Sequence, residues 1–468
     1  MLGKGSVVAA CRVLVFALVL VLWGCASVQN LPINQPTTDV NAGLPPPRPN
    51  PVADDELLIG LAFSGGGTRA AAFSFGMLQE LSQPYRSRSG RAYDLLKHVD
   101  FVSGVSGGSV TAAYFGIKKQ AALKDFRERF LLRDAESELR TEFSLANISR
   151  AFSGGVNEDT PLRKWLDANL FEGATFGDMR EDSRPRIWIN ATDLYNRTPF
   201  VFGRTAFSMI CSDLATYPIS AAVAASAAVP VAFAPVVIET FPDKCNARLP
   251  LWVTQARARS NTSPMAAAFA QGIQRYRDGS MKYIKLLDGG LVDNFGLSGF
   301  TIGLETADQP YEPMTQTQAV KLRRVLFLVA DAGQTIEGNW AQTLAGPSGS
   351  DLIMAATDAA LVATVRASYT AFDAMLNRWK QRLIAWRCSL SPARVRELRG
   401  SDSAWNCRDL QMYIGRVSFS QLGPERAARL GSIATRFVLP QDQVDDLIAG
   451  GRDATAENPS MKAFLGSL

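Results

Sequence analysis

The stretch that decides the fold is ELLIGLAFSGGGTRAAAFSFGMLQELS, residues 56–82. Residues 57–63 form an apolar run without strict alternation, which is typical of a strand buried on both faces of a parallel sheet. The run SGGG at 64–67 breaks that strand, and residues 68–82 have the composition of a helix. The stretch therefore predicts a strand, a glycine turn and a helix in immediate succession.

The same succession recurs in HVDFVSGVSGGS, residues 98–109. Here the predicted strand covers 99–103, glycines follow, and a helix begins at about residue 109. Further apolar strands fit residues 187–191, 283–287 and 325–330, with helical stretches between them. Alternation of this kind predicts a three-layer α/β/α domain around a mostly parallel central sheet.

The chain from about residue 350 onward reads as a helical C-terminal extension of the same domain. Seven large apolar residues alternate in spacings of four and three, which places them on one face of a long helix packed on the core. They are Val365, Tyr369, Phe372, Leu376, Trp379, Leu383 and Trp386. Residues 436–451 predict a strand end and then a short helix that Gly450 stops. No linker interrupts residues 57–468, so we expect them to form a single folded catalytic domain that includes the helical C-terminal part.

Composition and charge indicate a globular protein and give no sign of a nucleic-acid partner. The 468-residue chain is 47% hydrophobic and 20% charged, as expected for a globular protein with a substantial core. Its formal charge of +5 is spread along the sequence without a basic block, so we expect no nucleic-acid partner. Nothing in the sequence indicates the oligomeric state.

The first 24 residues predict an export signal. The apolar run at 13–23, VLVFALVLVLW, is too short to span a bilayer and fits the hydrophobic region of a signal peptide. It ends in Leu-Trp-Gly-Cys, which resembles a lipobox with Cys25 as the lipidated residue; the alternative is an uncleaved signal anchor. Residues 25–56 then predict a Pro-rich tether. Because no aspartate follows Cys25, we expect an exported lipoprotein of the outer membrane of a Gram-negative cell.

Removal of the signal and lipidation of Cys25 would leave four cysteines for disulfide formation in an oxidising compartment. These are Cys211, Cys245, Cys388 and Cys407, which allow three pairings between which the sequence does not choose. No pair of cysteines has C-x-x-C spacing and the chain has one histidine, so we expect no metal site.

Ser106 is the candidate nucleophile. It stands in Gly104-Val-Ser-Gly-Gly108, the G-x-S-x-G pattern of a serine on a sharp turn between a strand and a helix. The sole histidine, His98, opens the strand that Ser106 ends, so it lies roughly 16 Å away at the opposite edge of the sheet. A Ser-His-Asp triad is therefore excluded, and the base must be an Asp, Glu, Lys or Tyr.

Asp288 is the preferred base, because it follows the apolar strand 283–287 and precedes two glycines that allow a sharp turn. We expect it at the carboxyl-terminal tip of a parallel strand, beside Ser106. Asp193 and Asp331 also stand at predicted strand ends and remain as alternatives. An aspartate of ordinary pKa is a weak base at neutral pH, so desolvation would have to raise the pKa of this carboxyl.

The glycine block at 65–67 has two possible functions. With Thr68, Arg69 and Ala70 it matches the dinucleotide fingerprint, but no second strand with an acidic end follows at the required distance. The alternative is an oxyanion hole, because free N–H groups at a helix N-terminus stabilise a developing negative charge. Further along, residues 239–282 carry five arginines and read either as a partial cover over the site or as a solvated loop.

Three blocks together resemble those of the patatin-like phospholipases: SGGGTR at 64–69, GVSGG at 104–108 and Asp288-Gly289-Gly290. The small-residue segment 222–236 is also similar to that family, and the resemblance covers about residues 57–295. One departure is Ala70, where the family often has glycine.

The resemblance implies a Ser106–Asp288 dyad, with the N–H groups of Gly65, Gly66 and Gly67 as the oxyanion hole. It implies that Arg69 holds this loop or contacts a phosphate. The expected activity is hydrolysis of a phospholipid or another acyl-ester lipid through an acyl-serine, as in a phospholipase A, lysophospholipase or esterase, without a metal or organic cofactor. The alternatives are a catalytically silent lipid- or protein-binding lipoprotein and a dinucleotide-binding oxidoreductase.

Overall fold

The structure is a computed structural model that describes residues 29–42, 44, 56–87, 90–140, 154–179, 185–258, 263–334, 342–344, 346 and 350–468. The predicted signal peptide at 1–24, the lipidation site Cys25 and much of the predicted tether lie outside the described residues. Among the residues that are described, no helix combines the length and the apolarity needed to cross a membrane.

A mixed sheet forms the centre of the molecule, in the order β10-β9-β1-β4-β5-β8-β7, with β6 paired to β5. Its first five strands are parallel, whereas β8 is antiparallel to both β5 and β7. The bounds are β1 Leu57–Phe63, β4 Val99–Val105, β5 Arg186–Asp193, β6 Thr198–Phe202, β7 Val236–Glu239, β8 Tyr283–Asp288, β9 Arg324–Asp331 and β10 Gln411–Ser418. A separate hairpin joins β2 Pro84–Arg86 and β3 Ala92–Asp94.

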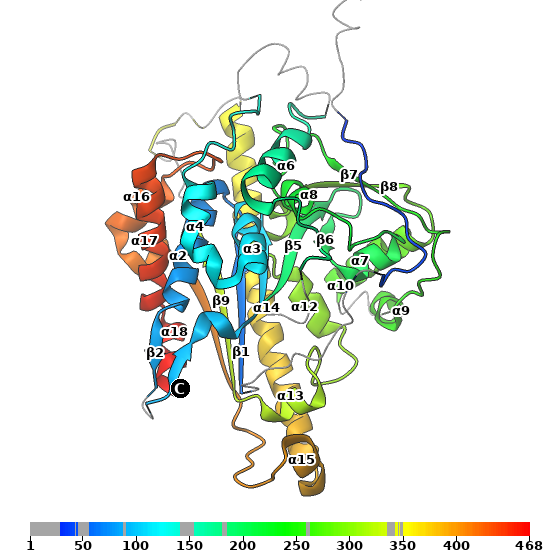
Figure 1. Cartoon of the computed structure of the whole chain (residues 1–468), viewed down its shortest axis with the longest axis vertical. Coiled ribbons are helices and arrows are strands. Elements are labelled where there is room, and N and C mark those ends of the chain that lie inside the picture. The colour runs from blue at the N-terminus through cyan, green and yellow to red at the C-terminus, as the bar shows by residue number, and fades with distance from the viewer. Residues whose placement is uncertain are drawn as a thin grey trace, which may run out of the picture.

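Helices cover both faces of the sheet, which confirms the three-layer α/β/α architecture (Figure 1). Alternate side chains of β9 enter two different cores: Leu326 and Leu328 belong to one cluster, Phe327 and Val329 to the other. A strand buried on both faces needs apolar side chains at every position, which is why these strands lack alternation.

One face of the sheet is covered mainly by α2 Gly67–Leu81, α3 Gly107–Lys118, α4 Ala122–Phe126, α6 Thr160–Leu166, α7 Arg204–Met209, α8 Ile219–Ser226, α16 Pro424–Gly431, α17 Gln441–Glu457 and α18 Pro459–Ser467. The other face carries α12 Ser298–Glu305, α13 Gln316–Lys321 and α14 Ser350–Ser389. The remaining described α-helices are α9 Leu251–Ala258, α10 Pro264–Arg277, α11 Gly290–Asp293 and α15 Pro392–Arg399.

The predicted long helix is α14, and its apolar face lies on the second core as expected. Phe372, Trp379 and Leu383 are fully or nearly fully buried there, against β9 residues such as Phe327. The four-and-three spacing thus marks the packed face of this helix.

The helix predicted to stop at Gly450 instead continues to Glu457 as α17. Gly451 packs against Phe73 and Gly76 of α2, and a β-carbon on Gly451 would lie 2.0 Å from the carbonyl oxygen of Phe73. Gly451 therefore permits the close approach of α17 and α2, and α17 continues through both Gly450 and Gly451. Strands β6, β7 and β10 were not predicted at all.

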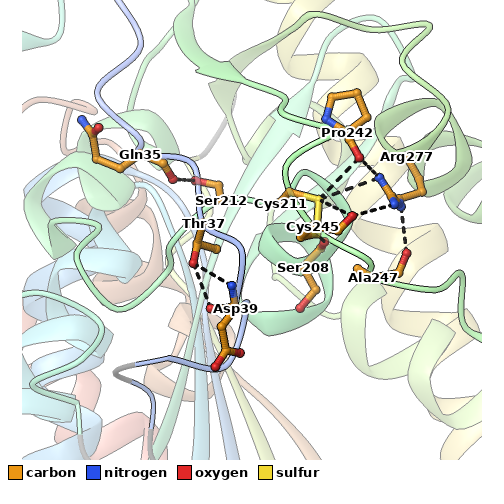
Figure 2. Close-up of a disulfide and its surroundings, with 10 residues drawn as sticks. All are labelled: Gln35, Thr37, Asp39, Ser208, Cys211, Ser212, Pro242, Cys245, Ala247 and Arg277. Carbon is orange, nitrogen blue, oxygen red and sulfur yellow. Dashed lines mark hydrogen bonds between the residues drawn. A yellow bond between two sulfur atoms is a disulfide. The ribbon is translucent and has the colours of Figure 1, made fainter.

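Two disulfides join neighbours in the sequence, Cys211 with Cys245 and Cys388 with Cys407. The sequence left three pairings open, and the structure has the one that closes the shortest loops. The first disulfide lies where residues 35–39 cross the body (Figure 2). There the N–H of Thr37 donates to the carbonyl of Cys211, and the Ser212 hydroxyl donates to the carbonyl of Gln35.

Residues 29–42, predicted as part of the tether, lie against the folded body. The amide of Asn30 donates to the carbonyls of Ala234 and Pro235. Asn34 bonds both the N–H and the carbonyl of Glu239, the last residue of β7. These side chains satisfy backbone groups along the free edge of β7, which explains why a Pro- and Asn-rich segment follows the surface here.

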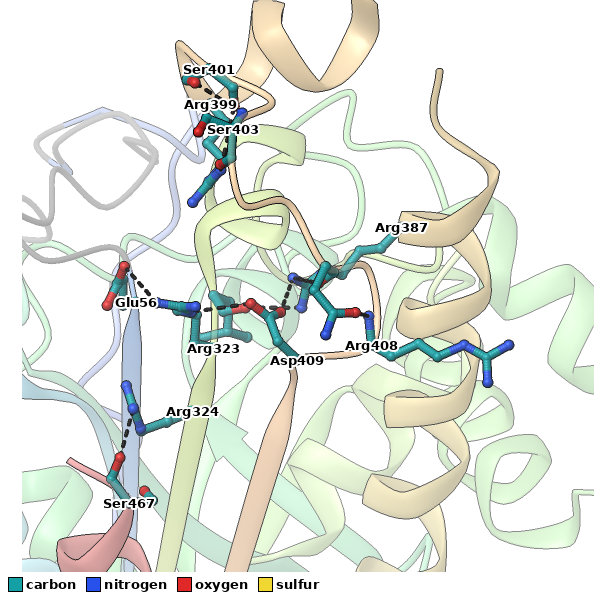
Figure 3. A network of polar contacts seen from close by, with 12 residues as sticks. Glu56, Arg323, Arg324, Arg387, Arg399, Ser401, Ser403, Arg408, Asp409 and Ser467 are labelled. Atoms are coloured by element: carbon teal, nitrogen blue, oxygen red, sulfur yellow. Dashed lines mark hydrogen bonds and ion pairs between the residues drawn. The ribbon is translucent and has the colours of Figure 1, made fainter. Parts of the chain in front are cut away.

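A buried arginine joins the end of α14 to the start of β10 (Figure 3). Arg387 is 1% exposed, pairs with Asp409 at 2.5 Å and donates to the carbonyl of Leu322 at 3.0 Å. Asp409 also accepts from Arg323 at 3.1 Å, and the second disulfide lies beside this network. Because the buried charge is paired and hydrogen-bonded, its burial is tolerated.

Candidate active site

Ser106 stands where β4 ends and α3 begins, with φ 50° and ψ −123°. A positive φ is uncommon for a residue other than glycine and is a form of backbone strain found at functional sites. Two contacts hold the turn: the N–H of Ser106 donates to the hydroxyl of Ser226 at 2.9 Å, and its carbonyl accepts from the hydroxyl of Ser109. The predicted sharp turn therefore exists at this serine.

The two glycine turns pack directly on each other. A β-carbon on Gly107 would lie 1.9 Å from the carbonyl oxygen of Gly67, so the chains can meet only because residue 107 is glycine. Gly67 itself has φ +59°, a conformation that favours glycine. The helix N-termini that follow β1 and β4 are thereby brought together beside Ser106.

Asp288 is the last residue of β8 and pairs with Ala191 of β5. The preceding residue of β5, Asn190, pairs with Val105 at the end of β4. Its N–H donates to the carbonyl of Ala228 at 2.8 Å, and its carbonyl accepts from the hydroxyl of Thr192 at 2.8 Å. The prediction that Asp288 ends a parallel strand is wrong, because β8 runs antiparallel to β5. The carboxylate nevertheless reaches the level of Ser106, because β8 approaches it from beyond the end of β5.

Burial sets the electrostatics of this pair. Ser106 is 4% and Asp288 8% exposed. Desolvation raises the pKa of the Asp288 carboxyl from 3.8 to about 6, and hydrogen bonds from the Gly290 N–H and the Ser106 hydroxyl oppose that rise. The Gly290 N–H lies 2.8 Å from one carboxylate oxygen. The carboxyl is thus a stronger base than an exposed aspartate, and it lies close enough to the Ser106 hydroxyl for that group to lower its pKa.

The predicted oxyanion block separates into two parts. The N–H of Gly65 donates to the carbonyl of Asn294 at 3.1 Å and is therefore engaged within the protein. Gly66 and Gly67 remain as candidate donors at the start of α2. Gly107, the first residue of α3 and the neighbour of Gly67, is a further candidate that our sequence reasoning missed. Its signal was its place directly after the serine in G-x-S-x-G.

Arg69 supports the loop. Its side chain is 3% exposed and donates to the carbonyls of Ala332 and Ile433. Of the two roles that the sequence left open, these bonds favour holding the glycine block over contacting a phosphate.

A segment from the C-terminal region, residues 433–437, contacts the glycine block. The carbonyl of Arg436 accepts from the N–H of Thr68 at 2.8 Å, and a β-carbon on Gly67 would lie 2.4 Å from that same oxygen. The Arg436 side chain pairs with Glu136 at 2.6 Å. The loop that carries the candidate oxyanion donors is therefore fixed partly by residues far along the chain.

The other candidates lie elsewhere. His98 precedes β4, whereas Ser106 follows it, so the full length of the strand separates them. Asp193 accepts from the hydroxyl of Tyr276 and from Asn196, and Asp331 accepts from the Gly333 N–H and pairs with Arg416. Both carboxylates thus have structural partners.

Sequence reasoning missed Ser226 and Asn190. The Ser226 hydroxyl accepts from the Ser106 N–H and donates to the carbonyl of Asn190 at 2.6 Å. The Asn190 amide donates to the hydroxyl of Ser103 and to the carbonyl of Gly104. Together they fix the serine turn to β5; the small-residue helix that carries Ser226 was the one available signal.

The predicted cover, residues 239–282, contains α9 and α10, and α10 packs on α7, β6 and α12. A cavity of about 550 Å³ lies beside these helices, lined by residues such as Trp252, Ala266 and Arg382. None of its lining residues belongs to the Ser106 site.

The family model for patatin-like phospholipase matches residues 61–301, just over half of the chain. Two solved structures are similar. Human GIVD cytosolic phospholipase A2 has 12% identity and a TM-score of 0.30, over 62% of this chain and 47% of that one. VipD from Legionella pneumophila has 13% identity and a TM-score of 0.32, over 94% of this chain and 72% of that one. No curated protein matches the sequence.

Proposed function

The chain belongs to the patatin-like phospholipase family, and from that premise we propose that it hydrolyses acyl-ester lipids, with Ser106 as nucleophile and Asp288 as base. One observation carries the proposal: a buried carboxyl, whose pKa burial raises to about 6, lies beside a serine on a strained turn. The substrate class is phospholipid or another ester of a long-chain acid.

In the first step, Asp288 takes the proton of the Ser106 hydroxyl while Oγ attacks the carbonyl carbon of the ester. The negative charge moves to the carbonyl oxygen, where the N–H groups of Gly66, Gly67 and Gly107 would stabilise it. The tetrahedral intermediate collapses, the C–O bond to the leaving group breaks, and Asp288 returns the proton to the departing alcohol. The acyl group remains on Ser106.

In the second step, Asp288 takes a proton from water, and the resulting hydroxide attacks the acyl-serine. Collapse of the second tetrahedral intermediate breaks the bond to Oγ, and the serine regains its proton from Asp288. The products are a free carboxylic acid and the alcohol, which for a diacyl phospholipid is a lysophospholipid. A single carboxylate moves every proton, so no imidazole is needed.

We also propose that the protein is an exported lipoprotein, attached through Cys25 to the outer membrane of a Gram-negative cell. The sequence features at 13–25 support this, and incorporation of radiolabelled palmitate into the wild-type chain but not into Cys25→Ala would test it.

The activity itself is tested by incubating the full chain with diacyl phospholipids, lysophospholipids and monoglycerides and identifying the products by mass spectrometry. We expect release of free fatty acid from at least one class. A chain that is folded but releases no acid from any lipid or from a short-chain p-nitrophenyl ester would be a silent member of the family, and the proposal would be wrong.

The pH dependence follows from the raised pKa of Asp288. The base must be ionised, so kcat/KM should be constant at neutral pH and fall as the pH drops through about 6. At pH 5 we expect roughly a tenth of the plateau value, because about nine-tenths of the carboxyl is then protonated. A soluble ester at constant ionic strength provides the measurement. A plateau that extends to pH 5, or an inflection near 7.5, would contradict the assignment.

A further inference from the structure

Outside the active site, aromatic and basic side chains gather where the β5–β6 turn meets the start of β8. Leu194, Tyr195 and Tyr283 are 38%, 67% and 40% exposed. The N–H of Leu194 donates to the carbonyl of Lys285 at 3.0 Å, which joins the two segments. We call these three residues, with Arg197, Arg275, Lys282 and Lys285, the Tyr–Lys patch.

Three of the four cations of the patch lie over its aromatic rings. Arg275 is 5.4 Å from the centre of the Tyr195 ring, and Lys282 and Lys285 are 5.2 and 5.4 Å from that of Tyr283. Along β8, Tyr283 and Lys285 are exposed while Ile284 is buried, as expected for one outward face of a strand. The rings and the charges are therefore presented together to the outside.

The patch has an excess of positive charge. Two carboxylates border it: Glu239 is the register partner of Tyr283, and Asp278 has its pKa lowered partly by Arg275. In the described part of the chain, none of the four cations forms an ion pair within 4.0 Å with either. Asp193 is buried beneath the turn and accepts from Tyr276 and Asn196. Four cations facing two carboxylates leave the surface positive.

We propose that the Tyr–Lys patch is the surface by which the domain rests on an anionic phospholipid bilayer. Tyrosine and leucine side chains insert at the headgroup level, and lysines and arginines bind anionic headgroups. A polynucleotide would use the cations, but the exposed leucine and the lysine-covered tyrosine fit a lipid interface better. The biological role of this contact rests on the proposed function, because the contact would bring the enzyme to its lipid substrate. The test of the contact does not require hydrolysis.

Two features of the fold place the Tyr–Lys patch near both the proposed active site and the N-terminal segment. The strand that begins at Tyr283 ends at Asp288, so the patch lies about 17 Å from the proposed base. Asn34 bonds Glu239, which is the register partner of Tyr283, so the N-terminal segment follows the neighbouring strand edge. Eight residues lie between Cys25 and Asn34, so a lipid-bearing Cys25 would be at most about 30 Å from Asn34 along the chain.

The first test measures contact without requiring catalysis. The full-length Ser106→Ala chain is reconstituted in vesicles of phosphatidylcholine, either alone or with about 30% phosphatidylglycerol, and acetylation of each lysine is followed by mass spectrometry. Lys282 and Lys285 should react about fivefold more slowly in the anionic vesicles, and about 0.5 M NaCl should remove the protection. Lys124, exposed on α4, serves as the internal control and should not change.

Equal reactivity of Lys282 and Lys285 in the two kinds of vesicle would overturn the proposal. So would protection by a single-stranded oligonucleotide without protection by anionic vesicles. Neither outcome depends on whether the protein is a hydrolase.

The second test compares Lys282→Glu/Lys285→Glu with Lys124→Glu/Arg378→Glu, which changes the net charge equally at exposed cations on α4 and α14. The quantity measured is the rate on phosphatidylglycerol in vesicles divided by the rate on a soluble ester. It should fall about tenfold or more in the patch variant and stay at the wild-type value in the control. Equal ratios in the two variants would overturn the proposal, whereas absence of both rates would overturn only the proposed function.

Discussion

Ser106→Ala should lower the rate of phospholipid hydrolysis by about 10⁴-fold or more, because it removes the atom that forms the acyl-enzyme. The fold should persist, since the Ser106 N–H and carbonyl, and not its hydroxyl, make the bonds to Ser226 and Ser109. The measurement is initial rate at matched protein concentration, with circular dichroism to verify folding.

His98→Ala is the matched control for this prediction. The imidazole lies at the opposite end of β4 from Ser106, so we expect an activity close to that of the wild type. A folded His98→Ala variant as inactive as Ser106→Ala would mean that the base is assigned to the wrong residue.

Asp288→Asn should lower the rate by about 10³- to 10⁴-fold, because an amide accepts a hydrogen bond but cannot take the serine proton. The amide oxygen can still accept from the Gly290 N–H, so the turn should keep its geometry. Residual activity should also lose the inflection near pH 6 that the carboxyl produces.

The same variant should be more stable than the wild type at neutral pH. Because the folded pKa of Asp288 lies above its unfolded value, its contribution to stability is complete below pH 3.8 and is lost as the pH rises through about 6. The difference between 3.8 and 6 corresponds to about 3 kcal/mol, which is an upper estimate of the gain in free energy of unfolding.

Urea unfolding at pH 7.5 measures this gain, and Asp278→Asn is its control. Asp278 also precedes a glycine, but its pKa is lowered by hydrogen bonds from Ser280, so its replacement should stabilise nothing. A decrease in the stability of Asp288→Asn at neutral pH would contradict the buried-base description.

The sequence predicted those parts of the fold whose signals are local. The apolar run of β1, the glycines and the start of α2 lie within one stretch, and the same holds for β4 and α3. Strand β10, QMYIGRVS, was missed because it lies at the edge of the sheet and carries polar residues among its apolar ones. Edge strands contain fewer apolar residues than central strands, so their sequence signal is weaker.

Features that depend on distant partners could not be read from the sequence. The direction of β8 is set by its pairing with β5 and β7, so the parallel strand predicted before Asp288 was wrong although its position was right. The engagement of the Gly65 N–H depends on the carbonyl of Asn294, more than 200 residues away in sequence. Assignment of the remaining oxyanion donors to Gly66, Gly67 and Gly107 stays a prediction.

Strand β9 lies wholly beyond residue 301, where the family match ends, yet it pairs with β1 along all seven residues from Leu57 to Phe63. Arg436 likewise reaches back to Thr68. An expression fragment trimmed to the matched span would lose the first four residues of β1, leave one side of the rest of that strand unpaired and remove the support of the loop before α2. Unpaired strand edges promote aggregation. The autonomous folding unit is therefore longer than the segment by which its relatives are recognised.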